Sequence, residues 1–491
     1  MPPFVPTARE ILLLTCLLGF LLSISSTFKP GNTPLSISDL ARLKSSNAYI
    51  EEDSEPVPLT YEGTYALDKS LNAPLRWGQG TVPETKIIAH VPGWSIFDKL
   101  YFLNGTIYIV TDTPSLVPDR ALITSSGVMI KNGPVAEAQR IPTDKDMRVI
   151  DTDEARKLFG EQAERLDGVT WFVNDPKQFI THYYHWSAEL FFGLWRTYSS
   201  LDPSMPPSGE TNLPAPRRIL FSHLDADNWR DYASMNQQVL YSAFPSITLE
   251  FMNDWLDRVA MGKPFVLDRV VFADRAAAMH GYNFLRTQRT AANAFALPGS
   301  VNWWLPIRNS VVGFSGLSLN QDKGFTNGMS NAPVITYISR QGWGRRMLIQ
   351  EHHDKLVEEL YKLRDTYGYE VNVVSMDKLS RMEQLSLSGR TTIMMGVHGN
   401  GLTSLLWMRP TPRSTVMEFF FPGGFAHDYE YTTRALGMVH YGFWGNSYFT
   451  RPDTPPVKYP EGFQGNEIPI DGALVAKLCH ERLILAEEAD D

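Results

Sequence analysis

The region after Pro333 alternates strand-like and helix-like segments, and this alternation constrains the fold more than any other feature of the sequence. Short apolar runs rich in Val, Ile, Met and Phe predict strands, and the amphipathic segments between them predict helices. In chain order these are strands at 334–339, 370–375, 391–397 and 414–421, helices at 353–368 and 377–388, a further helix after 397 and a last one at 472–489. Strands that alternate with helices form a parallel sheet, whose ligands bind beyond the carboxyl ends of the strands.

The region before this alternation predicts a second α/β domain. A chain of 491 residues with 43% hydrophobic content is too long for one ordinary domain, so two are expected. Strand-like runs occur at 106–110, 169–173, 218–221 and 270–272, and an apolar helical pattern at 186–198. The predicted boundaries are 86–310 for the N-terminal domain, 311–450 for the C-terminal domain and 451–491 for a C-terminal tail and helix.

The N-terminus predicts entry into the secretory pathway. Arg9 precedes an apolar run at 11–22, which fits either an uncleaved signal anchor with a cytoplasmic N-terminus or a signal peptide cleaved near 23–26. Residues 29–85 are rich in Ser, Pro and charge and predict a stem. We therefore expect residues 1–28 to hold a lumenal body at the membrane of the Golgi or endoplasmic reticulum, as a single-pass type II protein.

Charge and cysteine content narrow the possible partners and compartments. The formal charge of −9 and the lack of a Lys/Arg cluster argue against a protein that binds nucleic acid through its phosphates. Only Cys16 and Cys479 occur, and Cys16 lies in the apolar run, so we expect no disulfide within a lumenal body. The sequon at Asn104 is compatible with N-glycosylation in the lumen.

The motif GVHGNGLTS at 396–404 predicts an anion site. Its two glycines let the backbone turn tightly and approach a ligand, and the helix expected to follow would point free amides outward. Such a helix start beside an imidazole suits a diphosphate, whose charge could be neutralised without a metal. The residues expected to bind are His398, Gly399, Asn400, Gly401, Leu402 and Thr403. The alternative is an ordinary strand-to-helix turn with a capping histidine.

Two further features fall at the same predicted edge of the sheet. The motif ISRQGWGRR sets four polar residues after a strand: Ser339, Arg340, Arg345 and Arg346. Guanidinium groups are shaped for phosphate or carboxylate oxygens, so we expect an anionic ligand here, unless the arginines pair with Glu351 or Asp354. Glu418, in an otherwise apolar strand, is suited to accept hydrogen bonds from a ribose diol, unless it is an acid paired with an arginine.

In the N-terminal domain, the segment THYYHWSAEL opens a helix with a candidate catalytic base. His185 and Glu189 are four residues apart, so they share one face of the helix. Either side chain could take a proton from a sugar hydroxyl, and the sequence leaves the choice between them open. The alternative is a histidine at a helix start and a solvated glutamate.

The motifs ISRQGWGRRM, GVHGNGLTSLLWM and VMEFF, in this order and at these separations, resemble glycosyltransferase family 61. That family includes plant xylan xylosyl- and arabinosyltransferases and animal protein O-linked N-acetylglucosaminyltransferases. The resemblance runs from roughly Val169 to Phe421. It implies a GT-B fold, with two Rossmann-like domains facing a cleft, and an inverting, metal-independent transfer from a UDP-sugar to a glycan or glycoprotein hydroxyl. The nucleotide sugar is a co-substrate, and no other cofactor is implied.

The resemblance also assigns roles to single residues. It places the donor motif of the family on Arg340, Arg345 and Arg346, and the His-Gly-Ala-Gly motif on His398, Gly399 and Gly401. Asn400 stands where alanine is usual, which adds a side-chain amide near the phosphates, and Glu189 stands where the family commonly has aspartate. These departures leave the donor preference and the identity of the base open.

Two other functions are compatible with the sequence. Asp225 and Asp227 are carboxylates at i and i+2, which could hold a divalent cation in a metal-dependent transferase. A catalytically inactive relative that binds glycans is the other alternative. The sequence names neither the sugar nor the acceptor.

Overall fold

The computed structural model describes residues 74–317 and 332–485, which fall in one compact unit, Lys69–Asp491. The predicted signal segment, 1–28, and most of the predicted stem, 29–85, lie outside the described residues. Within the described ranges, no helix is long and apolar enough to cross a membrane.

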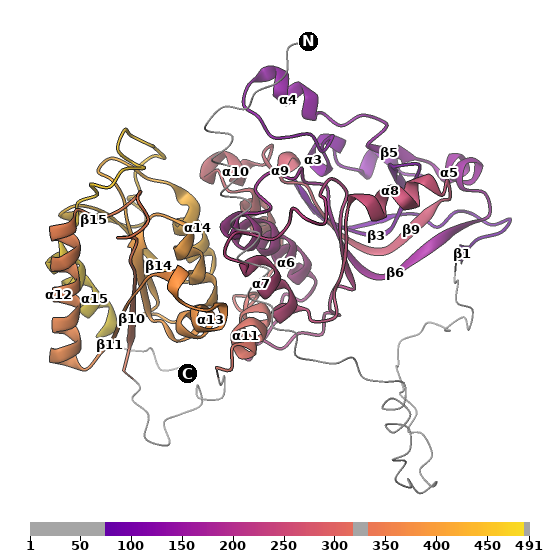
Figure 1. The fold of residues 1–491 in the computed structure, drawn as a ribbon. Helices are drawn as coiled ribbons and strands as arrows, with labels where there is room; N and C mark the ends of the chain where they lie inside the picture. The colour runs from indigo at the N-terminus through magenta and orange to yellow at the C-terminus, as the bar shows by residue number, and fades with distance from the viewer. Residues whose placement is uncertain (1–73, 318–331, 486–491) are drawn as a thin grey trace, which may run out of the picture. The chain divides into compact units, whose positions relative to one another are not determined.

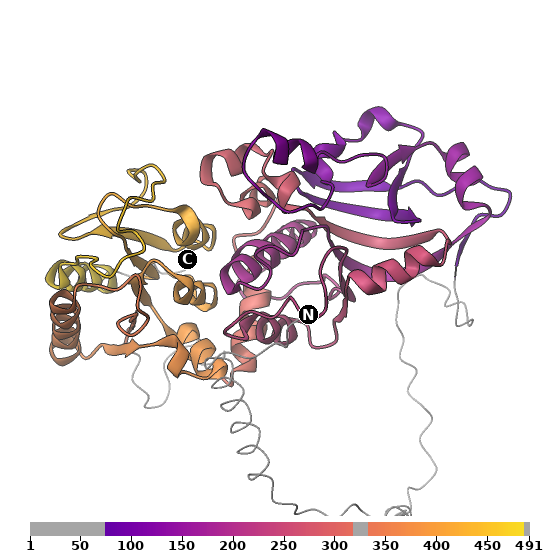
Figure 2. The same cartoon turned by 45° about the horizontal axis from the view of Figure 1, so that its top comes forward.

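Residues 74–317 contain a mixed nine-stranded sheet (Figure 1). Its strands are β1 Leu75–Arg76, β2 Lys86–Val91, β3 Trp94–Leu103, β4 Thr106–Val110, β5 Met147–Ile150, β6 Gln162–Val173, β7 Arg218–Phe221, β8 Thr248–Glu250 and β9 Phe265–Ala273. The order across the sheet is β5-β4-β3-β9-β6-β7-β8, with β2 paired to β3 and β1 to β6. The long strands β3, β9 and β6 run side by side through its middle (Figure 2).

This sheet differs from the Rossmann-like parallel sheet that the resemblance implied. Strand β6 pairs in parallel with β7 and β9, but β3 pairs antiparallel with β2, β4 and β9. For the pairs of β3 with β2 and β4, the cause is two tight connections, Pro92-Gly93 between β2 and β3 and Asn104-Gly105 between β3 and β4. Asn104 and Gly105 have φ angles of 51° and 85°, the left-handed conformation that closes a two-residue hairpin. Two residues cannot carry the chain back to start a parallel neighbour.

The predicted strands of this part are confirmed, although two of them are longer than expected. The runs 106–110 and 218–221 coincide with β4 and β7, whereas 169–173 and 270–272 fall within β6 and β9. The predicted helical pattern forms the π-helix η2, His185–Phe191, which continues into α6, Phe192–Tyr198. The other helices are η1 Pro114–Leu116, α3 Arg120–Ile123, α4 Pro134–Arg140, α5 Thr152–Phe159, η3 Ser199–Leu201, α7 Met235–Ala243, α8 Met252–Ala260, α9 Arg275–Ala278, α10 Tyr282–Thr287, η4 Thr290–Ala296 and α11 Leu305–Phe314.

Residues 332–485 contain the predicted parallel sheet. Its strands are β10 Val334–Ile338, β11 Glu370–Val374, β12 Ile393–Val397, β13 Thr415–Phe419, β14 Val439–Trp444 and β15 Ser447–Phe449. The order is β11-β10-β12-β13-β14-β15, and all pairs are parallel except β14 with β15. The sequence did not predict β14 and β15. Strand β14 pairs with β13, and β15 forms the edge of the sheet opposite β11.

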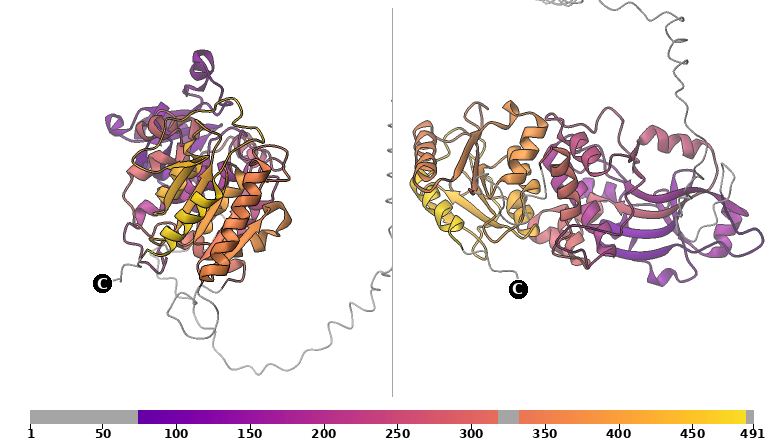
Figure 3. Two further views of the ribbon diagram at one scale, coloured as in Figure 1. Left: turned by 90° about the vertical axis from the view of Figure 1, so that its left-hand side faces the viewer. Right: turned by 90° about the horizontal axis from the view of Figure 1, so that it is seen from below.

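Helices cover both faces of this second sheet (Figure 1). They are α12 Gln350–Tyr367, η6 Met376–Lys378, α13 Arg381–Arg390, η7 Asn400–Trp407, α14 His427–Ala435 and α15 Gly472–Leu483. The left view of Figure 3 shows α12 and α15 side by side on one face, where the leucines at 356, 360 and 363 are buried as a single stripe. Residues beyond 450, expected as a tail and helix, thus add α15 to the core of this sheet.

The segment after β12 differs from the expected helix. It is a 3-10 helix, η7, and not an α-helix. Because its side chains from Leu402 to Trp407 are all buried, packing against the neighbouring helices determines its conformation more than capping does.

One hydrophobic core connects the helices next to the two sheets. Buried side chains of η2, α6, α7 and α11 belong to the same cluster as those of α13, η7 and α14. Trp304 Nε1 donates to the carbonyl of Leu406 at 2.8 Å, and the buried Arg308 donates to the carbonyls of Trp407 and Met408. Residues from both sheets can therefore contribute to one pocket.

Candidate active site

A pocket of about 870 Å³ opens beyond the carboxyl ends of β10 and β12. Open parallel sheets bind their ligands at this edge. The start of η2 and the loop 232–234 also line the pocket, so both parts of the body contribute. Its charged and polar lining residues include His182, His185, Ser339, Arg340, Arg345, Arg346, Asp377, Arg381, His398, Asn400 and Asp428.

The loop after β10 presents three arginines without an acidic partner. Arg340 and Arg346 are half-buried, and within the described residues neither they nor Arg345 form an ion pair. The alternative pairings with Glu351 and Asp354 are not observed in the described residues, and the carboxylate of Asp354 accepts a hydrogen bond from Gln350. Burial and the neighbouring charge of Arg346 lower the pKa of Arg340 to about 10, as expected for positive charges that lack a counter-charge. An anionic ligand would supply that counter-charge.

Local backbone geometry keeps two of these side chains at the pocket. Arg346 has a φ of 52°, which long side chains rarely adopt, and its Nη1 donates to the carbonyl of His398 at 3.1 Å. The guanidinium of Arg340 lies against Gly399, where a Cβ would come within 2.7 Å of Nη1. The Nε atoms of both arginines are buried without a partner in the described chain. Strain and orphaned donors of this kind are typical of a ligand site.

Glu418 occupies a different position from the one expected. It is fully buried in β13, and its carboxyl oxygens lie 2.5 Å from His398 Nδ1 and 2.8 Å from His440 Nε2. It does not line the pocket, so the structure does not support the predicted contact with a ribose. The reason is that β13 is an inner strand covered on both faces, so every one of its residues is buried. Glu418 instead holds the ring of His398, which lines the pocket.

The turn that follows His398 also needs a correction. Leu402 and Thr403 are buried and do not line the pocket, and the Leu402 amide donates to the carbonyl of Gly399 at 3.0 Å, so it does not face an anion. Gly401 does line the pocket, and a Cβ there would lie 2.9 Å from Ile338 Cγ2.

Asn400 lines the pocket, but its side-chain oxygen serves the fold. The Oδ1 atom accepts hydrogen bonds from the Tyr184 amide at 3.1 Å and from Thr403 Oγ1 at 3.3 Å. The residue that replaces the usual alanine of the family therefore connects η7 to the start of η2.

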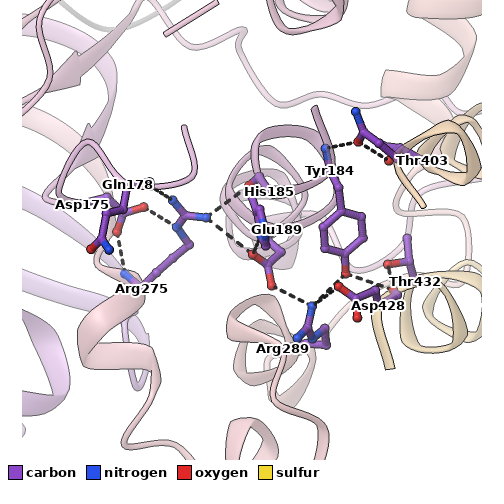
Figure 4. Close-up of polar contacts among 11 residues, drawn as sticks. Asp175, Gln178, Tyr184, His185, Glu189, Arg275, Arg289, Thr403, Asp428 and Thr432 are labelled. Atoms are coloured by element: carbon purple, nitrogen blue, oxygen red, sulfur yellow. Dashed lines mark hydrogen bonds and ion pairs between the residues drawn. The ribbon is translucent and has the colours of Figure 1, made fainter. Parts of the chain in front are cut away.

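The pair predicted on one helix face is in contact (Figure 4). His185 Nδ1 lies 2.7 Å from Glu189 Oε2. The His185 side chain is 26% exposed and lines the pocket, whereas that of Glu189 is 8% exposed and does not. Glu189 is therefore not a solvated residue, and of the two candidates only His185 faces the pocket.

Two arginines contact the Glu189 carboxylate in addition to His185, and Arg275 Nη1 also donates to the His185 carbonyl at 3.2 Å. Arg275 Nη1 lies 3.6 Å from Oε2 and Arg289 Nη1 lies 3.5 Å from Oε1 (Figure 4). Each arginine has a second anchor: Arg275 Nε donates to Asp175 at 2.5 Å, and Arg289 Nη1 donates to Asp428 on α14 at 2.7 Å. The carboxylate thus lies in a chain of compensated charges.

These contacts determine which nitrogen of His185 carries a proton. Burial by itself raises the pKa of Glu189, but His185, Arg289 and Arg275 outweigh it and lower that pKa to about 2. An ionised carboxylate can only accept, so His185 Nδ1 carries the proton. Nε2 has no hydrogen-bond partner in the described part of the chain and is free to accept one.

The sequence did not indicate several residues of this site: Arg275, Arg289, Asp428 and His440. None has a spacing that links it to His185 or Glu418, because each contact joins segments far apart in the chain. The one weak signal is position, since Arg275 follows the end of β9 and Asp428 follows β13.

The remaining predicted residues lie outside the pocket. Asp225 and Asp227 are on the loop after β7, and neither lines the pocket. No group of three or more His, Cys, Asp or Glu side chains in residues 74–317 and 332–485 has the arrangement of a metal site. Asn104 is exposed at the β3–β4 turn.

Residues 183–417 match the protein-family model described as Glycosyltransferase 61. The protein is therefore a glycosyltransferase, an enzyme that moves a sugar from an activated donor to an acceptor. The matched segment assigns the chain to glycosyltransferase family 61, which confirms the resemblance, and it contains His185, the arginine loop and His398. A comparison with curated proteins finds no match.

Replacement of Glu189 by glutamine should make stability less dependent on acid pH. Folding lowers the pKa of Glu189 from 4.5 to about 2, so its contribution is present above the unfolded pKa and is lost as the pH falls toward 2. The free energy of unfolding should therefore fall more steeply between about pH 6 and pH 3 for the unchanged protein than for Glu189→Gln, as measured by urea unfolding. Glu351→Gln, on the exposed surface of α12, should keep the original slope. Parallel curves for the unchanged protein and Glu189→Gln would contradict the ionised, buried carboxylate.

Proposed function

We propose that this glycosyltransferase moves a sugar from a UDP-sugar to a hydroxyl of a glycan or glycoprotein, with inversion at the anomeric carbon and without a metal ion. The family resemblance favours a donor of xylose, N-acetylglucosamine or arabinose type. The observation that carries the proposal is one pocket lined both by arginines without counter-charges and by a histidine with a free Nε2. The arginines suit a leaving diphosphate, and the histidine suits a hydroxyl that must lose a proton.

In the proposed reaction, the acceptor oxygen attacks the anomeric carbon while the bond from that carbon to the β-phosphate oxygen breaks. His185 Nε2 takes the hydroxyl proton, and Glu189 stabilises the imidazolium through Nδ1. Arg340 and Arg346 neutralise the charge on the departing UDP, and His398 donates a hydrogen bond to it. One bond forms and one breaks, and attack from the opposite side inverts the configuration. Glu189 is thus a positioning residue and His185 the base.

We further propose a GT-B-like arrangement, with the donor on the C-terminal part and the acceptor on the N-terminal part. Support comes from the parallel order β11-β10-β12-β13-β14 and from the position of the arginines and His398 after adjacent strands. The placement of Asp225 and Asp227 away from the pocket favours neutralisation of the phosphates by arginine over the metal-dependent alternative.

We also propose that the body is lumenal and that residues 1–28 place it, as a type II protein, in the Golgi or endoplasmic reticulum. The exposed Asn104, at a hairpin turn, is accessible to an oligosaccharide. An N-glycan-removing enzyme should lower the mass of the full-length protein from eukaryotic cells, and Asn104→Gln should abolish that shift. An unchanged mass, together with protease sensitivity from the cytosolic side, would contradict this orientation.

The role of His185 can be separated from that of Glu189 by kinetics. His185→Ala should lower kcat by about 10²–10⁴ with little change in UDP affinity, because the proton acceptor is removed. It should also abolish the acid limb of the pH–rate profile, because that limb arises from protonation of the base. Glu189→Gln should lower kcat while that limb survives, displaced, because the imidazole remains. A normal pH limb in His185→Ala, with loss confined to Glu189→Gln, would make the carboxylate the base.

The arginine loop can be tested by titration of UDP. Arg346→Ala should weaken binding by roughly 1.5–3 kcal/mol, since a charged hydrogen bond to phosphate is lost. Arg346→Gly should weaken it equally, because glycine adopts the left-handed φ of residue 346 without strain. Arg364→Ala, an exposed arginine of α12 paired with Asp365, is the control. Calorimetry with a chelator present tests the metal-dependent alternative in the same titration, and unchanged affinity in both Arg346 variants would exclude a phosphate contact.

A further inference from the structure

The segment between β6 and η2 exposes an aromatic ring beside the candidate base. Phe179 is 46% exposed, although the next residue, Ile180, is buried in the main core. The ring centroid of Phe179 lies 4.8 Å from that of His185, with the ring planes tilted by 46°. Exposure of a large apolar side chain forgoes hydrophobic stabilisation, so the exposed position of Phe179 needs a physical explanation.

The backbone at Phe179 is strained, and its neighbours hold it in place. Its φ of 66° lies in the left-handed region, where a bulky residue is an outlier. The Gln178 side chain exchanges hydrogen bonds with both backbone groups of Ile130, and the His182 amide donates to the Phe179 carbonyl at 3.1 Å. Strain that the surroundings impose in this way clusters at ligand sites.

A second exposed ring adjoins the same histidine. The ring centroid of His182 lies 4.9 Å from that of His185, and His182 is exposed and lines the pocket. We call Phe179 and His182 the aromatic rim. The rim lies on the N-terminal part of the body, whereas the arginines and His398 follow strands of the second sheet. The rim therefore comes from other elements than the groups proposed to hold the nucleotide. His182 lines the same pocket as those groups, and Phe179 lies beside the pocket, against His185.

We propose that the aromatic rim is the acceptor subsite, where a pyranose ring packs its C–H face against Phe179 and presents a hydroxyl to His185 Nε2. This inference rests on the proposed function. The face of an aromatic ring is electron-rich, and the C–H groups on one face of a sugar ring carry partial positive charge, so the two surfaces attract each other while excluding water. A rigid ring beside the base also orients the hydroxyl for proton transfer.

The test separates the ring of Phe179 from its backbone. Phe179→Gly removes the ring and relieves the left-handed strain, so the variant should melt no lower than the unchanged protein. With xylohexaose as the acceptor probe, its Kd, measured by calorimetry in the presence of UDP, should rise roughly tenfold or more, and KM for it should rise in parallel. UDP affinity should stay unchanged, because the groups proposed to hold the nucleotide follow strands of the second sheet. Phe179→Tyr should restore binding, and Tyr448→Ala, 44% exposed on β15, is a control of similar exposure.

Each other outcome has a definite meaning. A fall in kcat with unchanged Kd and KM for xylohexaose would overturn the subsite and leave Phe179 as a residue that only positions His185. Weaker binding of a serine-containing peptide, with xylohexaose unaffected or not bound, would also overturn it, because the acceptor would be a polypeptide. If the unchanged protein neither binds UDP nor hydrolyses UDP-sugars, the proposed function fails and the subsite fails with it. Normal donor hydrolysis with unchanged acceptor binding in Phe179→Gly overturns the subsite alone.

Discussion

The buried carboxylate of Glu189 is the constraint on which the geometry of the site depends. His185, Arg275 and Arg289 surround it at 2.7, 3.6 and 3.5 Å, and without them an isolated charge at this depth would be strongly destabilising. Arg289 also contacts Asp428 on α14, so the same chain of ion pairs joins η2 to a helix that packs on the second sheet. The orientation of the His185 ring therefore follows from satisfying a buried charge, and not from helix geometry alone.

The two sides of the pocket differ in whether the protein itself supplies counter-charges for its charged side chains. Around Glu189 every charge has a counter-charge within the protein, which suits groups that must keep one geometry through a reaction cycle. Around Arg340 and Arg346 no carboxylate of the described residues forms an ion pair with the guanidinium groups, although Asp428 and Glu418 attract Arg346 at longer range, and the Nε atoms of both arginines are buried without partners. Uncompensated donors bind an anion without first breaking internal ion pairs, and they become most effective when the anion gains charge as it leaves. The two sides of the pocket thus differ: the charges around Glu189 are compensated within the protein, and the guanidinium groups of Arg340 and Arg346 have no ion-pair partner in the described residues.

The outcome for single residues shows where reasoning from the sequence succeeds. The β10–β13 strands, the leucine stripe of α12, and the arginines and His398 after adjacent strands follow from periodicity and from the rule that parallel strands end at one edge. Glu418 shows where such reasoning fails. The sequence pattern of an acid within an apolar strand is the same whether the acid contacts a ligand or a buried histidine, and in the structure Glu418 contacts His398 and His440. Leu402 is a second such case. Because η7 is a 3-10 helix, the Leu402 amide donates to the carbonyl of Gly399 and not to a ligand.

The sequence by itself determined the parallel sheet, the loops that carry the arginines and His398, the family, and the pairing of His185 with Glu189, since all of these depend on local periodicity and short motifs. Only the tertiary structure decided which member of that pair faces the pocket. Arg275 and Arg289 come from segments distant in the chain and form ion pairs with Glu189. These ion pairs keep the buried carboxylate ionised, whereas the His185 ring lines the pocket. The antiparallel half of the first sheet and the exposure of Phe179 were likewise decided there. Long-range packing and charge compensation cannot be predicted from sequence periodicity, because the residues that make contact are far apart in the chain and only the fold brings them together.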